Sequence, residues 1–136
     1  MLAGVTHADA PGLATVTLEF GPHRLRAEVA ADDVSRARGL MGRTRLGENE
    51  AMLFVFRQPE RHCMWMKNTP LPLAVAFIDQ EDRIINVVEM TPFDLTPHCA
   101  QRPARYALET HHGWFTRRGI GAGDRMRSRD PLPSPR

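Results

Sequence analysis

The chain has 136 residues, of which 42% are hydrophobic and 25% are charged, and its formal net charge at pH 7 is only +2. This length suits one domain, which can bury enough surface to form a core without a metal ion. The small net charge, with acids offsetting scattered arginines, argues against a nucleic-acid partner. No apolar run approaches the ~20 residues of a membrane-spanning helix, so we expect no integral membrane segment.

Residues 1–12 are expected to form a flexible leader. They include Ala8-Asp9-Ala10, which has the small-x-small form of a signal-peptidase site, but they lack a basic and an apolar region. Either this pattern is chance in an alanine-rich segment or it is the remnant of a longer signal peptide. We interpret it as a remnant, which indicates a periplasmic or exported protein, with a cytoplasmic location as the alternative.

Residues 13–126 are predicted to form a single β-rich domain. Apolar and polar residues alternate in Leu13–Phe20 and in His23–Ala30. This pattern predicts two strands of a hairpin with one solvent-exposed face, connected by a turn at Gly21-Pro22. Asp32-Asp33 is predicted to cap a short helix from Val34 to about Met41. Val34, Ala37 and Met41 would form its apolar face, and Gly42 would end it.

Continuous apolar runs follow this helix. Residues 51–56 and 73–78 are predicted as buried strands, and 84–90 as the return strand of a hairpin. Residues 91–103 are expected to form a long irregular loop, followed by a strand at 106–109, a helix at 112–118 and a strand at 124–126. Residues 127–136 contain three prolines and are predicted to be a disordered Arg/Pro tail. About seven short strands and two short helices indicate a β-sandwich or a partly closed β-barrel.

The densest chemical run lies at residues 62–69. If it is a strand, Cys63, Trp65 and Lys67 share one face, and His62, Met64 and Met66 share the other. Lys67 is notable because 17 of the 18 basic residues are arginine and it is the one lysine. Trp65 and Lys67 would line a groove for a small polar or anionic ligand, with Asn68 and Thr69 at its rim. Alternatively, Trp65 is a core residue and Lys67 extends into solvent.

Four further residues are candidate ligand contacts. Arg38 and Arg43 would form an anion clamp, or else they satisfy carbonyls at the end of the helix. Asp79 and Glu109 would add acidic groups, although Asp79 also suits a turn and Glu109 also suits an arginine partner. No Gly-x-Ser-x-Gly, phosphate loop or paired-histidine helix occurs, so we assign no catalytic residue and expect no cofactor.

The two cysteines, Cys63 and Cys99, leave three alternatives open. They form a disulfide if the compartment is oxidising, they remain buried thiols, or they join His and Met side chains at a metal site. Adjacent residues of a strand face opposite ways, so His62 and Cys63 would not share an ion easily. No two-residue-spaced cysteine pair, the strong signal for zinc, is present. We assign no metal ligand and treat the pair as a disulfide candidate.

Six motifs together resemble a known family. They are Arg38-Gly39-Leu40-Met41-Gly42-Arg43, Met52-Leu53-Phe54-Val55-Phe56, Trp65-Met66-Lys67-Asn68-Thr69, Ala76-Phe77-Ile78-Asp79, Tyr106-Ala107-Leu108-Glu109 and, last, Gly119-Ile120 with Gly123-Asp124. Their order and spacing are similar to a small prokaryotic family, the domain of unknown function numbered 192, over roughly Val16 to Met126. The resemblance implies a β-rich domain, often behind an export signal, and supplies no reaction.

The sequence therefore predicts a domain that binds a small polar or anionic ligand, or a protein partner, at Trp65, Lys67, Asn68 and Thr69. The alternative is an enzyme that uses Lys, Asp and Glu for acid–base chemistry on a small polar substrate. A second alternative is a metal-binding protein that uses His, Cys and Met.

Overall fold

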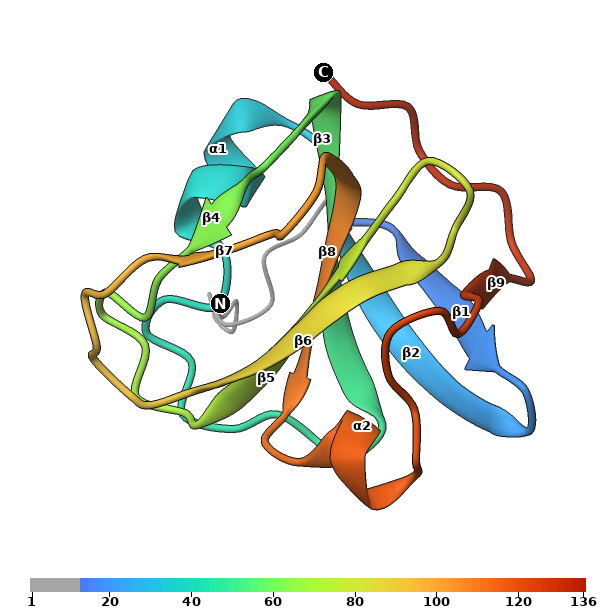
Figure 1. Cartoon of the computed structure of the whole chain (residues 1–136). Coiled ribbons are helices and arrows are strands. Elements are labelled where there is room, and N and C mark those ends of the chain that lie inside the picture. The colour runs from blue at the N-terminus through green and yellow to red at the C-terminus, as the bar shows by residue number, and fades with distance from the viewer. Residues whose placement is uncertain (1–12) are drawn as a thin grey trace, which may run out of the picture.

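The computed structural model, which describes residues 13–136, is organised around one seven-stranded sheet (Figure 1). The leader predicted for residues 1–12 lies outside this range. The strand order is β6-β5-β8-β3-β2-β1-β9, and a separate two-stranded sheet pairs β4 with β7. The large sheet is curled into a half-barrel, so the predicted mainly β, single-domain fold with two short helices is confirmed. The strands are β1 (Thr15–Phe20), β2 (His23–Ala30), β3 (Glu50–Glu60), β4 (Cys63–Met64), β5 (Leu73–Ile78), β6 (Ile84–Met90), β7 (His98–Cys99), β8 (Ala104–His111) and β9 (Arg127–Ser128).

The predicted hairpin at the start of the chain is present as β1 and β2. The two strands pair antiparallel with Leu18 opposite Leu25, and both of these side chains are buried on the same face. Strand β3 then pairs with β2 in parallel, unlike the other pairs of the sheet. A parallel neighbour needs a crossover connection, and the segment that carries helix α1 (Asp33–Arg38) provides it.

The central strands β3, β5 and β8 are buried on both faces, as their continuous apolar runs predict. Leu53 of β3 joins a core cluster on one face, where helix α2 (Trp114–Arg117) contributes Trp114 and Phe115. Met52 and Phe54 join a second cluster on the other face. Successive side chains of a strand point to opposite faces of the sheet, and both faces of β8 are covered by a core cluster. A polar side chain in the middle of β8 therefore reaches solvent only through a hollow in one of these cores.

Helix α1 begins as predicted but ends early. The Asp32 carboxylate accepts a hydrogen bond of 2.8 Å from the Ser35 backbone N–H, which confirms the N-cap. The helix stops at Gly39, not Gly42, because Gly39 takes a φ of 50° and a Cβ there would lie 3.2 Å from Phe54. The predicted apolar face is therefore wrong: no residue of α1 is buried, and Val34 is 77% exposed.

The run at residues 62–69 is a strand only at Cys63–Met64. Its partner is His98–Cys99, which lies within the segment predicted to be irregular. Beyond Met64 the chain turns, and Asn68 takes a φ of 54°, which a continued strand would not allow. The structure joins Cys63 and Cys99 in a disulfide across this small sheet.

The C-terminal segment is held against the sheet. Strand β9 pairs with β1, and the backbone N–H of Arg129 donates to the Thr17 carbonyl at 2.9 Å. The N–H of Arg136 donates to the Ala31 carbonyl at 2.7 Å. The structure thus differs from the disordered tail predicted for 127–136, because edge strand β1 offers free backbone groups that the prolines alone do not reveal. No helix within residues 13–136 has the length and apolar character needed to cross a membrane.

Candidate functional site

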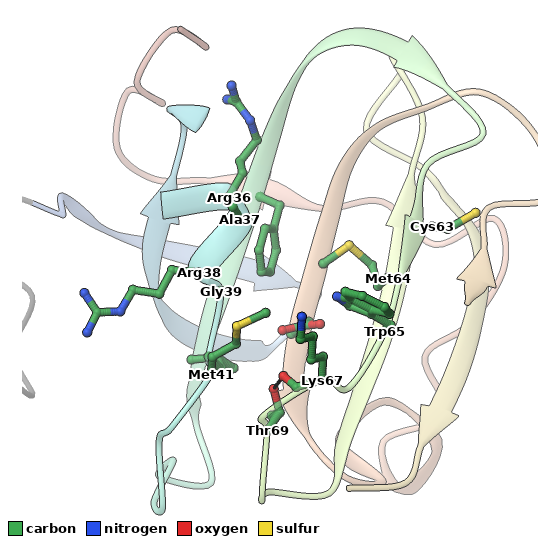
Figure 2. Close-up of a pocket in the computed structure, with 13 residues that line it drawn as sticks. Arg36, Ala37, Arg38, Gly39, Met41, Cys63, Met64, Trp65, Lys67 and Thr69 are labelled. Atoms are coloured by element: carbon green, nitrogen blue, oxygen red, sulfur yellow. Dashed lines mark hydrogen bonds between the residues drawn. The ribbon is translucent and has the colours of Figure 1, made fainter. Parts of the chain in front are cut away.

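A hollow of about 140 Å³ lies on the second core face, between three parts of the chain (Figure 2). One wall is the end of α1 and the turn after it, residues 36–41. The opposite wall is the segment 63–69, which carries β4 and the turn beyond it. Glu109 of β8 also lines the hollow. The site therefore combines two loops with the middle of a rigid sheet.

Trp65 and Lys67 lie together in the second wall. The Lys67 Nζ is 5.4 Å from the centre of the Trp65 ring, over its face, which is within the range of a cation–π contact. The indole is 47% exposed, so Trp65 is not a core residue. Figure 2 shows the Lys67 amine directed toward the space between Trp65 and Met41. Within residues 13–136, the Lys67 side chain has no hydrogen bond or acidic partner.

Glu109 is the most unusual residue of the site. It is only 4% exposed, and the sheet register places it between Met52 of β3 and Val75 of β5, both apolar and buried. Its carboxyl group has no hydrogen-bond or ion-pair partner in the part of the chain that the structure describes. Burial raises the pKa of Glu109 from 4.5 to about 8, because the charged form loses its hydration. Near neutral pH this side chain is a carboxylic acid that can donate a hydrogen bond.

Thr69 and two methionines complete the lining. Thr69 is buried, and its hydroxyl donates to the Lys67 carbonyl at 3.0 Å, which fixes the turn that presents the lysine. Met41 and Met64 line the hollow from opposite walls, with their sulfur atoms turned toward it (Figure 2). Sequence reasoning missed both methionines as lining residues. It assigned Met41 to the apolar face of a longer helix and Met64 to a core-facing strand position.

The two arginines of the first wall contribute little charge to the space itself. Arg36 donates to the Val55 carbonyl at 2.9 Å and pairs with Asp33 at 2.8 Å. Arg38 lines the hollow, but its guanidinium points away from it (Figure 2). Lys67 is therefore the cation that faces the hollow most directly among these three residues.

Three predicted contacts lie elsewhere. Arg43 donates to both carboxylate oxygens of Glu28 at 2.8 and 2.9 Å, so this guanidinium is held in an ion pair away from the lining. Asp79 accepts hydrogen bonds from two backbone N–H groups of its own turn, which is the role that a turn aspartate normally has. Asn68 does not line the hollow, and its carbonyl accepts the Gly42 N–H at 2.7 Å.

The structure gives Cys63, Cys99, His62 and His98 partners other than a metal ion. Both cysteines are used in the disulfide, and His62 stacks on Phe56 with ring centres 3.7 Å apart. His98 lies 3.5 Å from the Asp94 carboxylate. Within residues 13–136, no three His, Cys, Asp or Glu side chains are grouped so that they could hold a metal.

A family model described as "Uncharacterized ACR", DUF192, matches residues 15–128. The chain belongs to the DUF192 family. This match confirms the resemblance seen in the sequence motifs. The function of the family is unknown. No curated protein matches this DUF192 chain.

Two solved structures share the fold of this DUF192 domain. One, from Sinorhizobium meliloti 1021, is named only provisionally as a transcription regulator. It is 33% identical with a TM-score of 0.80, over 85% of this chain and 95% of that one. The other is a protein of unknown function from Novosphingobium aromaticivorans DSM 12444. It is 34% identical, also with a TM-score of 0.80, over 93% of each chain. These similarities identify the fold and the family without naming a ligand.

Proposed function

We propose that the hollow binds a small anionic ligand, with the Lys67 ammonium group as the main anchor. One observation carries the proposal: the lone lysine of an arginine-rich chain holds its amine at the hollow with no acidic partner among residues 13–136. A compact ammonium on a flexible stem suits a ligand oxygen in a confined space better than a planar guanidinium does.

The charges around the hollow support an anion. Glu109 is neutral near pH 7, so it does not oppose a ligand's negative charge. Arg36 and Arg38 lie in the facing wall, but neither guanidinium points into the space and Arg36 is paired with Asp33, so Lys67 supplies the main positive charge there. A charge-assisted hydrogen bond to Lys67 would contribute about 1.5–3 kcal/mol of binding free energy.

The size and apolar walls limit the ligand. The hollow has a volume of about 140 Å³, close to the ~150 Å³ cavity that holds one benzene molecule, and it is open on one side. Trp65, Met41 and Met64 present apolar surface next to the amine. This mixture of one aromatic, flexible thioethers and few polar groups is typical of sites for small organic molecules. We therefore propose an organic acid with on the order of six heavy atoms inside the hollow.

Calorimetric titration with matched small molecules tests this function. Propionate, a carboxylate, should bind more tightly than propionamide, its uncharged counterpart of nearly equal shape. Lys67→Ala should remove most of that difference. The control is Arg105→Ala, because Arg105 also lies over an aromatic ring, 5.1 Å from the centre of Tyr106, but outside the hollow. Equal binding of the acid and the amide would contradict the proposal, and so would a difference that survives Lys67→Ala.

A location outside the reducing cytoplasm is part of the proposal. The Cys63–Cys99 disulfide supports it, because such bonds persist mainly in oxidising compartments. A thiol count on protein taken from its native host and denatured without reductant tests this point. Two blocked cysteines are expected, and two free thiols would argue for the cytoplasm.

Acid–base catalysis is a second candidate function. The specific observation is that the pKa of Glu109, raised to about 8 by burial, lies near neutral pH, where a side chain can both take and give a proton. A screen of small carboxylic acids for turnover, repeated with Glu109→Gln, tests it. If Glu109→Gln loses turnover but still binds the acid, Glu109 acts in catalysis. If the wild type binds the acids and turns none of them over, only the ligand-binding function is supported.

A further inference from the structure

We infer that the Glu109 carboxylic acid donates a hydrogen bond to an uncharged oxygen of the ligand, so that the hollow selects small hydroxy- or oxo-acids. This inference rests on the anion site proposed above, and it names the chemical class that the site prefers. Lys67 would bind the carboxylate of the ligand, and Glu109 would donate a hydrogen bond to the ligand's hydroxyl or carbonyl oxygen.

Glu109 lies in the sheet between two apolar strands. Direct neighbours on either side are Met52 and Val75, so the carboxyl group is surrounded by apolar strands. A buried polar group without a partner destabilises the folded protein. Yet Glu109 is 4% exposed and unpartnered within residues 13–136, and the open side of its environment is the hollow. A ligand in the hollow can supply the missing partner.

The surroundings of Glu109 determine its protonation state. The charged groups that line the hollow with Glu109 are Lys67, Arg36 and Arg38, and none of them forms an ion pair with it. Its register partners on strands β3 and β5 are the apolar Met52 and Val75, and Phe54 of β3 belongs to the same apolar cluster. Burial, without a compensating cation, raises the pKa of this carboxyl to about 8. An anionic ligand would favour the protonated form further, because a second negative charge nearby disfavours ionisation.

The protonation state of Glu109 distinguishes two classes of ligand. A protonated Glu109 donates to a ligand oxygen, whereas an ionised Glu109 would attract a ligand ammonium, as in an α-amino acid. The Lys67 ammonium already faces the hollow, and a second cation beside it would be repelled. The arrangement therefore favours the neutral donor.

A series of four three-carbon acids tests the inference by calorimetry at pH 7. Propionate carries only the carboxylate, lactate adds a hydroxyl, pyruvate adds a carbonyl and alanine adds an ammonium group. Lactate and pyruvate should bind about fivefold to tenfold more tightly than propionate, since one added neutral hydrogen bond has about that effect. Alanine should bind more weakly than propionate.

Two variants connect this preference to Glu109. Glu109→Gln keeps a neutral donor of the same shape and should retain the preference for lactate, whereas Glu109→Met should lose it. For the wild type, the preference should decline above pH 8 as the acid ionises. In Glu109→Gln it should stay constant from pH 6 to pH 9. Far-UV circular dichroism checks that both variants are folded.

The outcomes separate this inference from the function on which it rests. If propionate binds through Lys67 but lactate and pyruvate bind no better, the anion site stands and the inference is overturned. Tighter binding of alanine, with loss of that binding in Glu109→Gln, would overturn it in favour of an ionised Glu109. If none of the four acids binds the wild type, both the anion site and the inference are overturned.

Discussion

The Lys67 ammonium lies 5.4 Å from the centre of the Trp65 ring, and both side chains border the same hollow. This contact pre-positions the cation without neutralising it, because the negative face of an aromatic ring attracts a cation but leaves its charge intact. In the function proposed above, a ligand carboxylate would form its ion pair with this amine at the position that the ring contact sets.

We expect Lys67→Ala to weaken propionate binding by about tenfold or more, because a charge-assisted hydrogen bond is lost. Lys67→Arg should restore part of the affinity, since the charge returns in a bulkier, planar form. Isothermal titration calorimetry measures both changes. Affinities in Lys67→Ala that match the wild type would show that the amine is not the anchor.

Fluorescence quenching can follow Trp65 separately from the other tryptophan. Trp65 is 47% exposed, whereas Trp114 is fully buried, so acrylamide should quench mainly Trp65. Lactate at saturating concentration should reduce that quenching, because the ligand would cover the indole. Trp65→Phe should remove both the quenchable signal and its response to lactate. Quenching of Trp65 that does not respond to bound lactate would place the ligand elsewhere.

The buried carboxyl of Glu109 should make stability depend on pH. In the folded protein this group keeps its proton up to about pH 8, whereas the unfolded chain loses it near 4.5. Between these values the folded state binds more protons, so raising the pH favours unfolding. The free energy of unfolding should fall relative to that of Glu109→Gln by up to about 4 kcal/mol from pH 5 to pH 8.

Urea unfolding of the wild type and Glu109→Gln across this pH range measures the effect. Other titrating groups are common to both proteins and cancel in the difference. Parallel pH profiles would mean that Glu109 is ionised in the folded state, contrary to this prediction.

The Cys63–Cys99 disulfide should stabilise the small sheet and, with it, one wall of the hollow. The bond spans 36 residues of sequence, for which the chain-entropy model gives about 4 kcal/mol of stability. The Cys63→Ser/Cys99→Ser double variant should therefore unfold at a lower urea concentration. Adding dithiothreitol should destabilise the wild type and leave this variant unchanged. If reductant affects both proteins equally, the disulfide is not its target.

Much of the large sheet is predictable from the sequence, because its strands carry clear apolar patterns. The run 73–78 is buried at every position, as a strand between two cores must be. The parallel pairing of β2 with β3 is not predictable in this way, since periodicity shows which residues are apolar and not which strands pair. The short strand β7 is also not predictable from the sequence. A strand of two residues is too short to show an alternating apolar pattern, and the partner of Cys99 is 36 positions away.

The candidate site is predicted in part. Trp65, Lys67 and Thr69 were found because their chemical types cluster in sequence, and the structure places all three at the hollow. Glu109 was named as one acid among several, and only its register opposite Met52 and Val75 shows that it is isolated. Arg43 is predicted as a ligand contact, but its guanidinium is paired with Glu28 of the neighbouring strand β2 and does not line the hollow. No local pattern links those two residues.

The hollow is lined by one residue from the middle of central strand β8, by the end of α1 with the turn after it, and by the short strand β4 with the turn beyond it. Loops tolerate substitution better than packed strands do. Substitutions at Met41, Met64 or Trp65 would therefore change the shape of the hollow and leave the large sheet intact. Proteins that share this sheet would therefore be free to differ in the residues that line the hollow.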